Sequence, residues 1–322
     1  MKFTSVPAGF TSFREPLPYA FDAEGAPRDI TFTIVDVESG ATIGAKKLYA
    51  ATAGQIDIAP YLRRAARCRM PDEVAECSMV DTGGRVKVRV EAEGVASPVR
   101  TFIAAKVADD KLYALLTTQY DRRAMAADEF DAIGYFAMPD AVVEIVVEAF
   151  GSGYERLVLT PPAGGQRTVA VTPRGFAFVP SSMRVTIEVD DEAADTIDYR
   201  IEENLSDACR LAWFNRHGAP ELYTFPVRKR RVVEATRGRI LHPLGGEDVA
   251  TGRDDALTLV SAYEPRAQAE AIAEAVASPE VRAVRGGRTR RVSLATDKAT
   301  LHGGEMNLVE VEIRASGEEG GL

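Results

Sequence analysis

Histidine and clustered acidic side chains are the residues of this sequence that could bind a metal, and their spacing argues against a site. The three histidines, His217, His242 and His302, are far apart and form no His-x-x-x-His pair. Acidic clusters occur at Asp109-Asp110, Asp190-Asp191-Glu192 and Asp254-Asp255, without the alternating spacing of a calcium loop. We therefore predict no metal site.

Motifs for nucleophilic catalysis and for phosphate binding are also missing. The sequence has no Gly-x-Ser-x-Gly, and its glycine clusters at Gly151-Ser152-Gly153 and Gly164-Gly165 follow strand-like runs without opening a helix. We predict no catalytic residue, no cofactor and no enzymatic activity. An uncharacterised hydrolase, in which the distant histidines and acidic residues converge, stays as an alternative.

Composition places the chain among folded proteins with two or three domains. It has 322 residues, of which 46% are hydrophobic and 27% are charged. The three cysteines, Cys68, Cys77 and Cys209, are too few for a disulfide framework. The sequence lacks an apolar run of eighteen residues and an apolar core near its N-terminus. We expect no signal peptide, no membrane partner, and a location in the cytoplasm or in a virion or prophage particle.

The charge distribution argues against a nucleic-acid partner. The net charge is −9, and the excess acid lies in residues 1–204, with 22 Lys and Arg against 31 Asp and Glu. Residues 205–322 carry 17 of each kind. Phosphate contact requires a net basic face, so we expect protein partners.

Short strands with frequent turns predict a β-sandwich in residues 1–106. The alternation in Arg85–Val90 places valines on one face and cations on the other. Five other strand-like runs flank it, at Ile30–Val37, Ala41–Tyr49, Gln55–Ile58, Val74–Val80 and Val99–Lys106. One short basic helix is expected at Tyr61–Arg69.

Residues 107–204 repeat this pattern and predict a second, divergent sandwich. Val142–Glu148 resembles Ile30–Asp36, and Arg184–Val189 resembles Arg85–Val90. The offset between the copies falls from 112 to 99 residues, so the second copy lacks a segment equivalent to the Tyr61–Glu73 region. We place the linker near Lys106–Lys111.

Residues 205–322 are predicted to form a mixed, β-rich domain with one helix near 265–277. Ala269, Ile272 and Val276 share a helical face there, and Pro279 prevents continuation. The Gly- and Asp-rich segment Leu244–Asp255 is predicted to be an exposed loop. The complete fold prediction is mainly β: tandem immunoglobulin/fibronectin-like β-sandwiches followed by a β-rich α+β C-terminal domain.

The stretch Cys209–Phe225 contains the single tryptophan of the chain and predicts a β-hairpin that nucleates a core. Asn215 and Gly218 suit the tight connection, because both residue types tolerate positive φ. The structural residues of this motif are Trp213, Asn215, Arg216, Gly218, Tyr223 and Phe225.

This motif resembles a pattern of phage and prophage virion or tail structural proteins of the Bacteroidetes type, Trp-Leu/Phe-Asn-Arg-x-Gly-Gly-x-x-x-Tyr-x-Phe. Ala219 stands where a second glycine is common. Three further stretches are similar to such proteins: Phe13–Tyr19, Ile56–Leu62 and Ala277–Val281. The resemblance implies a non-enzymatic tail or virion component. Its partners would be other virion or tail proteins, or copies of itself in a homo-oligomer.

Two basic runs are the candidate interaction residues: Arg228, Lys229, Arg230 and Arg231, and the later run that includes Arg288 and Arg290. They fit either an exposed strand edge protected by cations or a docking surface for an acidic partner. A ligand- or carbohydrate-binding sandwich is the alternative function. Its candidate aromatic residues are Tyr113, Tyr120, Tyr135 and Tyr154.

Overall fold

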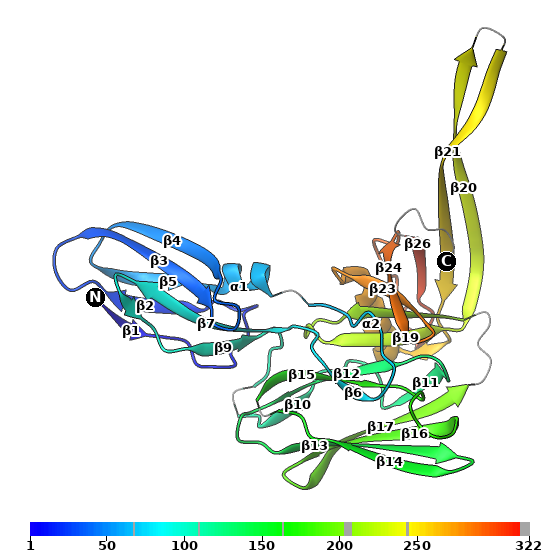
Figure 1. Cartoon of the computed structure of the whole chain (residues 1–322), viewed down its shortest axis with the longest axis horizontal. Helices are drawn as coiled ribbons and strands as arrows, with labels where there is room; N and C mark the ends of the chain where they lie inside the picture. The colour runs from blue at the N-terminus through cyan, green and yellow to red at the C-terminus, as the bar shows by residue number, and fades with distance from the viewer. Residues whose placement is uncertain (67, 109, 163, 203–207, 243–244, 316–322) are drawn as a thin grey trace.

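A computed structural model describes residues 1–66, 68–108, 110–162, 164–202, 208–242 and 245–315. The fold is mainly β, with short helices, and among the described strands all pairs but one are antiparallel. Figure 1 shows one sandwich at the N-terminal end, a second below the centre, a C-terminal sheet beside it and a long hairpin that projects away. None of the described helices has the length and apolar character needed to span a membrane.

The first sandwich packs a three-stranded sheet against a larger one. Its core comes from alternation, because Ile30, Phe32 and Ile34 of one strand and Val88 and Val90 of another are all buried. The small sheet has the order β1 (Lys2–Ser5), β2 (Pro18–Asp22), β5 (Ala53–Asp57). The large sheet has the order β4 (Thr42–Ala51), β3 (Arg28–Asp36), β7 (Arg85–Ala92), and β7 also pairs with β8 (Val95–Ala96) and β9 (Arg100–Ile103).

The middle sandwich is built in the same way, around a core that includes Ile145, Val147, Val185 and Ile187. One sheet has the order β10 (Tyr113–Leu115), β12 (Asp131–Ala137), β15 (Gly165–Val171), β6 (Ser78–Val80). The other has the order β11 (Arg122–Ala126), β17 (Glu192–Glu202), β16 (Pro180–Val189), β13 (Val143–Gly151), β14 (Tyr154–Leu159).

Strand order confirms the repeat. The order β1-β2-β5 in the first sandwich corresponds to β10-β12-β15 in the second, and β4-β3-β7-β9 corresponds to β14-β13-β16-β17. Seven strands therefore occur in the same sheet positions in both copies, as in immunoglobulin-like sandwiches. The shorter second copy is also explained, because β15 leads to β16 through residues 172–179, whereas β5 leads to β7 through α1 (Ala59–Ala65) and β6.

That longer connection departs from the predicted domain boundary. The strand expected at Val74–Val80 is shorter, and it pairs with β15 of the middle sandwich. Met70 and Val74 are also buried against the middle and C-terminal parts of the chain. Part of residues 1–106 therefore belongs structurally to the second sandwich. The expected helix is confirmed but ends at Ala65, before the predicted Arg69.

The C-terminal part forms a seven-stranded antiparallel sheet and a helical segment. The predicted helix is confirmed as α2 (Arg266–Ala273), which continues as the 3-10 helix η1 (Glu274–Ala277). A small pair joins β22 (Glu264–Pro265) to β25 (Met306–Asn307). The large sheet has the order β19 (Pro220–Phe225), β18 (Cys209–Phe214), β23 (Val281–Arg285), β24 (Arg288–Leu294), β26 (Glu310–Ala315), β21 (Gly245–Val260), β20 (Val227–His242).

The prediction of a loop at Leu244–Asp255 is wrong for residues 245–255, which belong to β21. Leu244 lies outside the described residues. The register of β20 against β21 runs from Val227 opposite Val260 to His242 opposite Gly245. Backbone pairing with β20 therefore imposes a strand on a sequence rich in glycine and aspartate.

Candidate functional site

The Trp213 hairpin is formed by β18 and β19 and anchors the C-terminal core. Trp213 and Phe225 are fully buried, together with Leu211, Ile272 and Val281. The predicted role of both aromatic residues in a core is confirmed. Within the described part of the chain, the Trp213 indole nitrogen has no hydrogen-bond partner, so this side chain contributes through packing.

Asn215 and Gly218 close the hairpin in different ways. The Asn215 Oδ1 accepts the backbone N–H groups of His217 (2.9 Å) and Ala219 (3.1 Å). Asn215 itself is absent from the described positive-φ positions, so the conformational reason proposed for it is wrong. Gly218 does have a positive φ, at 67°, and it fits the turn for the predicted reason.

The tip of this hairpin contacts both sandwiches. Asn215 Nδ2 donates to the carbonyl of Leu116 (2.7 Å), and Gln166 Nε2 donates to the carbonyl of Gly218 (3.1 Å). These two hydrogen bonds join the tip of the hairpin to the middle sandwich. On the other side, a Cβ added to Gly218 would lie 2.7 Å from the Cβ of Ala104, just after β9. The loop is therefore a joint at which three parts of the chain meet.

A buried carboxylate strengthens this joint. Glu221 is fully buried, and its oxygens accept hydrogen bonds from Thr117 Oγ1 (2.9 Å), Gln119 Nε2 (2.8 Å) and Asn215 Nδ2 (2.8 Å). Burial raises the pKa of Glu221, and the nearby Arg123 opposes that shift. Every neighbour named here is a donor, which is the arrangement that a carboxylate requires.

A second buried carboxylate, Asp131, begins β12. Its Oδ2 accepts from Arg123 Nη1 (2.8 Å) and from the Tyr199 hydroxyl (2.9 Å), while its Oδ1 lies 3.4 Å from Arg210 Nη2. The guanidiniums of Arg123 and Arg210 lower the pKa of Asp131 despite burial. Arg210 comes from β18, so this ion-pair cluster also ties the C-terminal sheet to the middle sandwich.

The other two motif residues, Arg216 and Tyr223, contact the helical segment and β22. Arg216 is exposed, and its Nη1 lies 3.2 Å from Glu274 Oε1. The Tyr223 hydroxyl donates to Glu264 Oε1 (2.7 Å) and accepts the backbone N–H of Ala262 (3.0 Å). Both contacts hold the hairpin to the helical segment and to β22.

The two basic runs occupy different positions in the sheet. Arg228, Lys229, Arg230 and Arg231 are exposed on β20, which is an outer strand of the C-terminal sheet, as the edge interpretation predicts. Arg288 and Arg290 lie on β24 and pair there with β23, whereas β26 joins β24 only from Val292 to Leu294. Arg288 Nε lies 3.3 Å from Glu73 Oε2.

The histidines whose side chains the structure describes, His217 and His302, form no metal-binding group with Cys, Asp or Glu side chains. His217 is half-buried in the hairpin loop, where burial lowers its pKa. His302 is exposed, and the side chain of His242 lies outside what the structure describes. Across the described residues, no three His, Cys, Asp or Glu side chains are grouped so that they could hold a metal ion.

The four candidate sugar-binding tyrosines are also spread out. Tyr135 is buried, and its ring centroid lies 6.3 Å from that of the half-buried Tyr113. Tyr154 is exposed and donates to Glu148. Tyr120 is 40% exposed and lines a cavity between the middle sandwich and the C-terminal sheet. These positions do not make one aromatic platform.

The outer part of the β20–β21 hairpin extends beyond the rest of the C-terminal sheet. β26 pairs with β21 only from Ala256 to Val260. Beyond that point, residues 233–242 and 245–255 pair with each other, and no third described strand joins them. We call these residues the ribbon, and Figure 1 shows it extending away from both sandwiches. Sequence reasoning missed it, because its composition resembles that of a loop.

Comparisons with known proteins do not assign a family. No family model matches the chain, and no curated protein matches it. A solved structure that resembles it is the crystal structure of trypsin activated alpha-2-macroglobulin from Escherichia coli, with 7% identity and a TM-score of 0.23. The similarity covers 97% of this chain and 23% of that one. This chain thus spans less than a quarter of that protein's length.

Proposed function

We propose that this chain is a non-enzymatic assembly protein, a component of a phage or prophage tail or virion, in which the ribbon contacts a neighbouring copy. The ribbon carries this proposal. A two-stranded hairpin without a third strand is at best marginally stable in water. Pairing or packing with a neighbour would supply the missing contacts.

The free edge of β20 supports the same proposal. The strand has sixteen residues, and in the described sheet it pairs only with β21. Its outer edge therefore presents backbone donors and acceptors, which is the usual template for strand addition. The exposed cations Arg228–Arg231 are at the base of the hairpin and prevent unselective pairing by repulsion between like charges.

Charge complementarity favours a second copy of this chain as the neighbour. Residues 107–204 contain 8 Lys and Arg against 18 Asp and Glu. The turn between β16 and β17 exposes Asp190, Asp191 and Glu192. A basic strand on one copy and an acidic sandwich on the next would form a head-to-tail contact, which generates rings or filaments.

The test is the mass of the protein in solution across a hundredfold dilution. In a shortened variant, residues 234–254 are replaced by Asn-Gly, because Val233 and Asp255 are opposite each other in the register and this turn suits a two-residue hairpin. We expect concentration-dependent oligomers for the wild-type chain. The shortened chain should remain monomeric and unfold at an unchanged temperature.

A charge variant separates the basic strand from the ribbon. Lys229→Gln/Arg230→Gln should weaken self-association and reduce its dependence on salt. Arg63→Gln/Arg64→Gln removes two exposed arginines of α1 and should have no effect. A wild-type monomer throughout the dilution series, or the same number of subunits in the wild-type and shortened particles, would overturn the proposal.

A further inference from the structure

The outer strand β14 of the middle sandwich has a free edge. It is the last strand of its sheet and, among the described strands, it pairs only with β13. The register runs without a shift from Ile145 opposite Leu159 to Phe150 opposite Tyr154. Figure 1 shows β14 at the lower margin of the molecule and the ribbon at the top. The two surfaces therefore lie on opposite sides of one copy.

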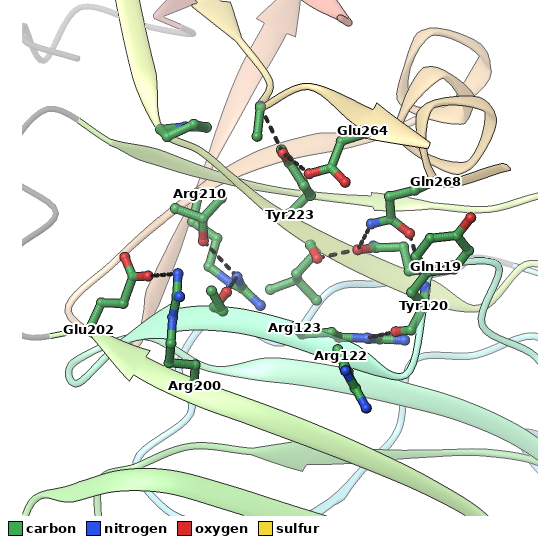
Figure 2. A pocket seen from close by; sticks show the side chains of 15 residues that line it. Gln119, Tyr120, Arg122, Arg123, Arg200, Glu202, Arg210, Tyr223, Glu264 and Gln268 are labelled. Carbon is green, nitrogen blue, oxygen red and sulfur yellow. Dashed lines mark hydrogen bonds and ion pairs between the residues drawn. The ribbon is translucent and has the colours of Figure 1, made fainter. Parts of the chain in front are cut away.

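Side chains cover the edges of other outer strands. On β4, the Tyr61 hydroxyl donates to the carbonyl of Ala45 (3.3 Å). β11 lines the cavity between the middle sandwich and the C-terminal sheet, and Figure 2 shows Arg210 close to it. Arg210 Nη1 donates to the carbonyl of Ala124 on that strand (3.2 Å). β14 has no such cover from the described residues, because its backbone pairs only with β13.

The sequence of β14 also lacks the usual protection of a strand edge. Outer strands are commonly shielded by lysine, by proline or by a bulge. The residues of β14 are YERLVL, without lysine or proline, and its pairing has no bulge. Tyr154 and Val158 are 55% and 37% exposed. This edge is therefore suited to accept a further strand.

Acidic side chains gather at one end of this edge. Ile145 is opposite both Leu159 and Ile187, so the C-terminal end of β14 lies at the same end of the sheet as the start of β13 and the end of β16. Exposed or half-buried carboxylates at this end of the sheet belong to Asp140, Glu144, Glu188, Asp190, Asp191 and Glu192. At the other end, residues 150–154 and 176–182 contain no charged residue. The edge therefore has an acidic end and an uncharged end.

This inference rests on the proposed function and names the surface that the ribbon contacts. We propose that β20 of one copy pairs antiparallel with β14 of the next copy. Antiparallel pairing places the basic run Arg228–Arg231, at the N-terminal base of β20, toward the acidic end of β14. Parallel pairing would place it at the uncharged end. Residues 233–242 of the ribbon are more than enough to span the six residues of β14. The contact joins copies head to tail.

A lysine on β14 tests the edge. Val158→Lys should weaken self-association of the full-length chain by about tenfold or more, because a cation on this strand opposes the basic strand of the neighbour. Val99→Lys is the matched control, since Val99 is 39% exposed and lies in the first sandwich. It should associate as the wild type does. Thermal unfolding of both variants checks that the fold is retained.

A charge exchange tests the orientation. Asp140→Lys/Glu144→Lys reverses the acidic end, and Lys229→Glu/Arg230→Glu reverses the base of β20. Each double variant alone should be monomeric at a concentration at which the wild type associates, because like charges then face each other. An equimolar mixture should associate again, since the basic strand of the first variant meets the acidic end of the second, and the reversed strand meets the reversed end.

The outcomes separate this inference from the proposed function. If the wild-type chain does not associate, both fail. If the wild type associates and the shortened chain does not, while Val158→Lys associates as the wild type does, the ribbon is the contact but β14 is not its acceptor. A mixture of the two charge variants that stays monomeric would overturn the antiparallel orientation. Equal weakening by Val99→Lys and Val158→Lys would also overturn the assignment to β14.

Discussion

Asp131 and Arg123 form a buried ion pair, with 2.8 Å between Oδ2 and Nη1 and side chains that are 0% and 4% exposed. Removing one partner of such a pair leaves a buried charge uncompensated. Asp131→Asn should therefore lower the free energy of unfolding by about 3–5 kcal/mol, as measured by denaturant titration. The exposed pair of Arg184 with Asp198 is the control, since Asp198→Asn should cost at most about 1 kcal/mol. Equal losses in both variants would contradict the buried cluster.

Glu221 should make stability depend on pH in the opposite sense to a salt-bridged carboxylate. Burial raises the pKa of Glu221 in the folded state above the ordinary value of 4.5. At pH values between 4.5 and this raised pKa, the folded chain therefore holds a proton that the unfolded chain has lost. Its contribution to stability therefore falls as pH rises from 4.5 through the folded pKa. Glu221→Gln lacks this titration. We expect the stability of the variant minus that of the wild type to increase over this window and then to level off.

This comparison requires chemical denaturation at several pH values between about 4 and about 7. The glutamine side chain of the Glu221→Gln variant places an amide nitrogen among donors, so a constant loss of stability is expected in addition to the pH-dependent part. A difference that stays constant with pH would show that the pKa of Glu221 is unchanged by folding.

Gly218→Ala should destabilise the three-part joint for two separable reasons. The positive φ of Gly218 costs an L-residue about 1–2 kcal/mol, and the new Cβ would lie 2.7 Å from Ala104 Cβ. Gly40→Ala supplies the matched control, because Gly40 has a φ of 70° and open space around it. The loss of stability in Gly218→Ala minus the loss in Gly40→Ala gives the cost of the steric contact with Ala104. Adding Ala104→Gly to Gly218→Ala should restore that amount of stability. Equal losses at Gly218 and Gly40 would exclude the close contact.

Tyr223→Phe should reduce stability by about 1–2 kcal/mol. The change removes the donor to Glu264 and the acceptor of the Ala262 N–H in a half-buried position. Tyr154→Phe removes the hydroxyl that donates to Glu148 on an exposed strand and should change stability by about 0.5 kcal/mol or less. Thermal unfolding of the two variants, measured side by side, gives both losses of stability. A larger loss for Tyr154→Phe than for Tyr223→Phe would contradict the stabilising role of the Tyr223 hydroxyl.

The sequence predicted those parts of the fold that depend on local periodicity. The valines of Arg85–Val90 alternate in the sequence and are buried in β7. Similar runs in the two sandwiches revealed the repeat. The position of β6 was not predictable, because its pairing with β15 joins segments that are far apart in the sequence. The ribbon was missed for a related reason, since its strands are specified by each other and not by β-favouring residue types.

The buried polar residues at the joint were the hardest to predict. Arg123, Asp131 and Arg210 come from three different strands. Their spacing along the chain does not predict that they lie together in the fold. One signal was available: Asp131 opens the run Asp131–Ala137, which is otherwise free of charge and is buried at every position. A carboxylate in such a run requires a buried cation as its partner, although the sequence does not specify which one.

The path of β6 affects the order in which the protein can fold during synthesis. Ser78–Val80 leaves the ribosome before β7 and β9 complete the first sandwich, yet its partner β15 is made only with residues 165–171. The first sandwich therefore closes around a connection whose central strand is still unpaired. A polypeptide nicked between β9 and β10 would leave two fragments that share a sheet, so they should co-purify until denatured.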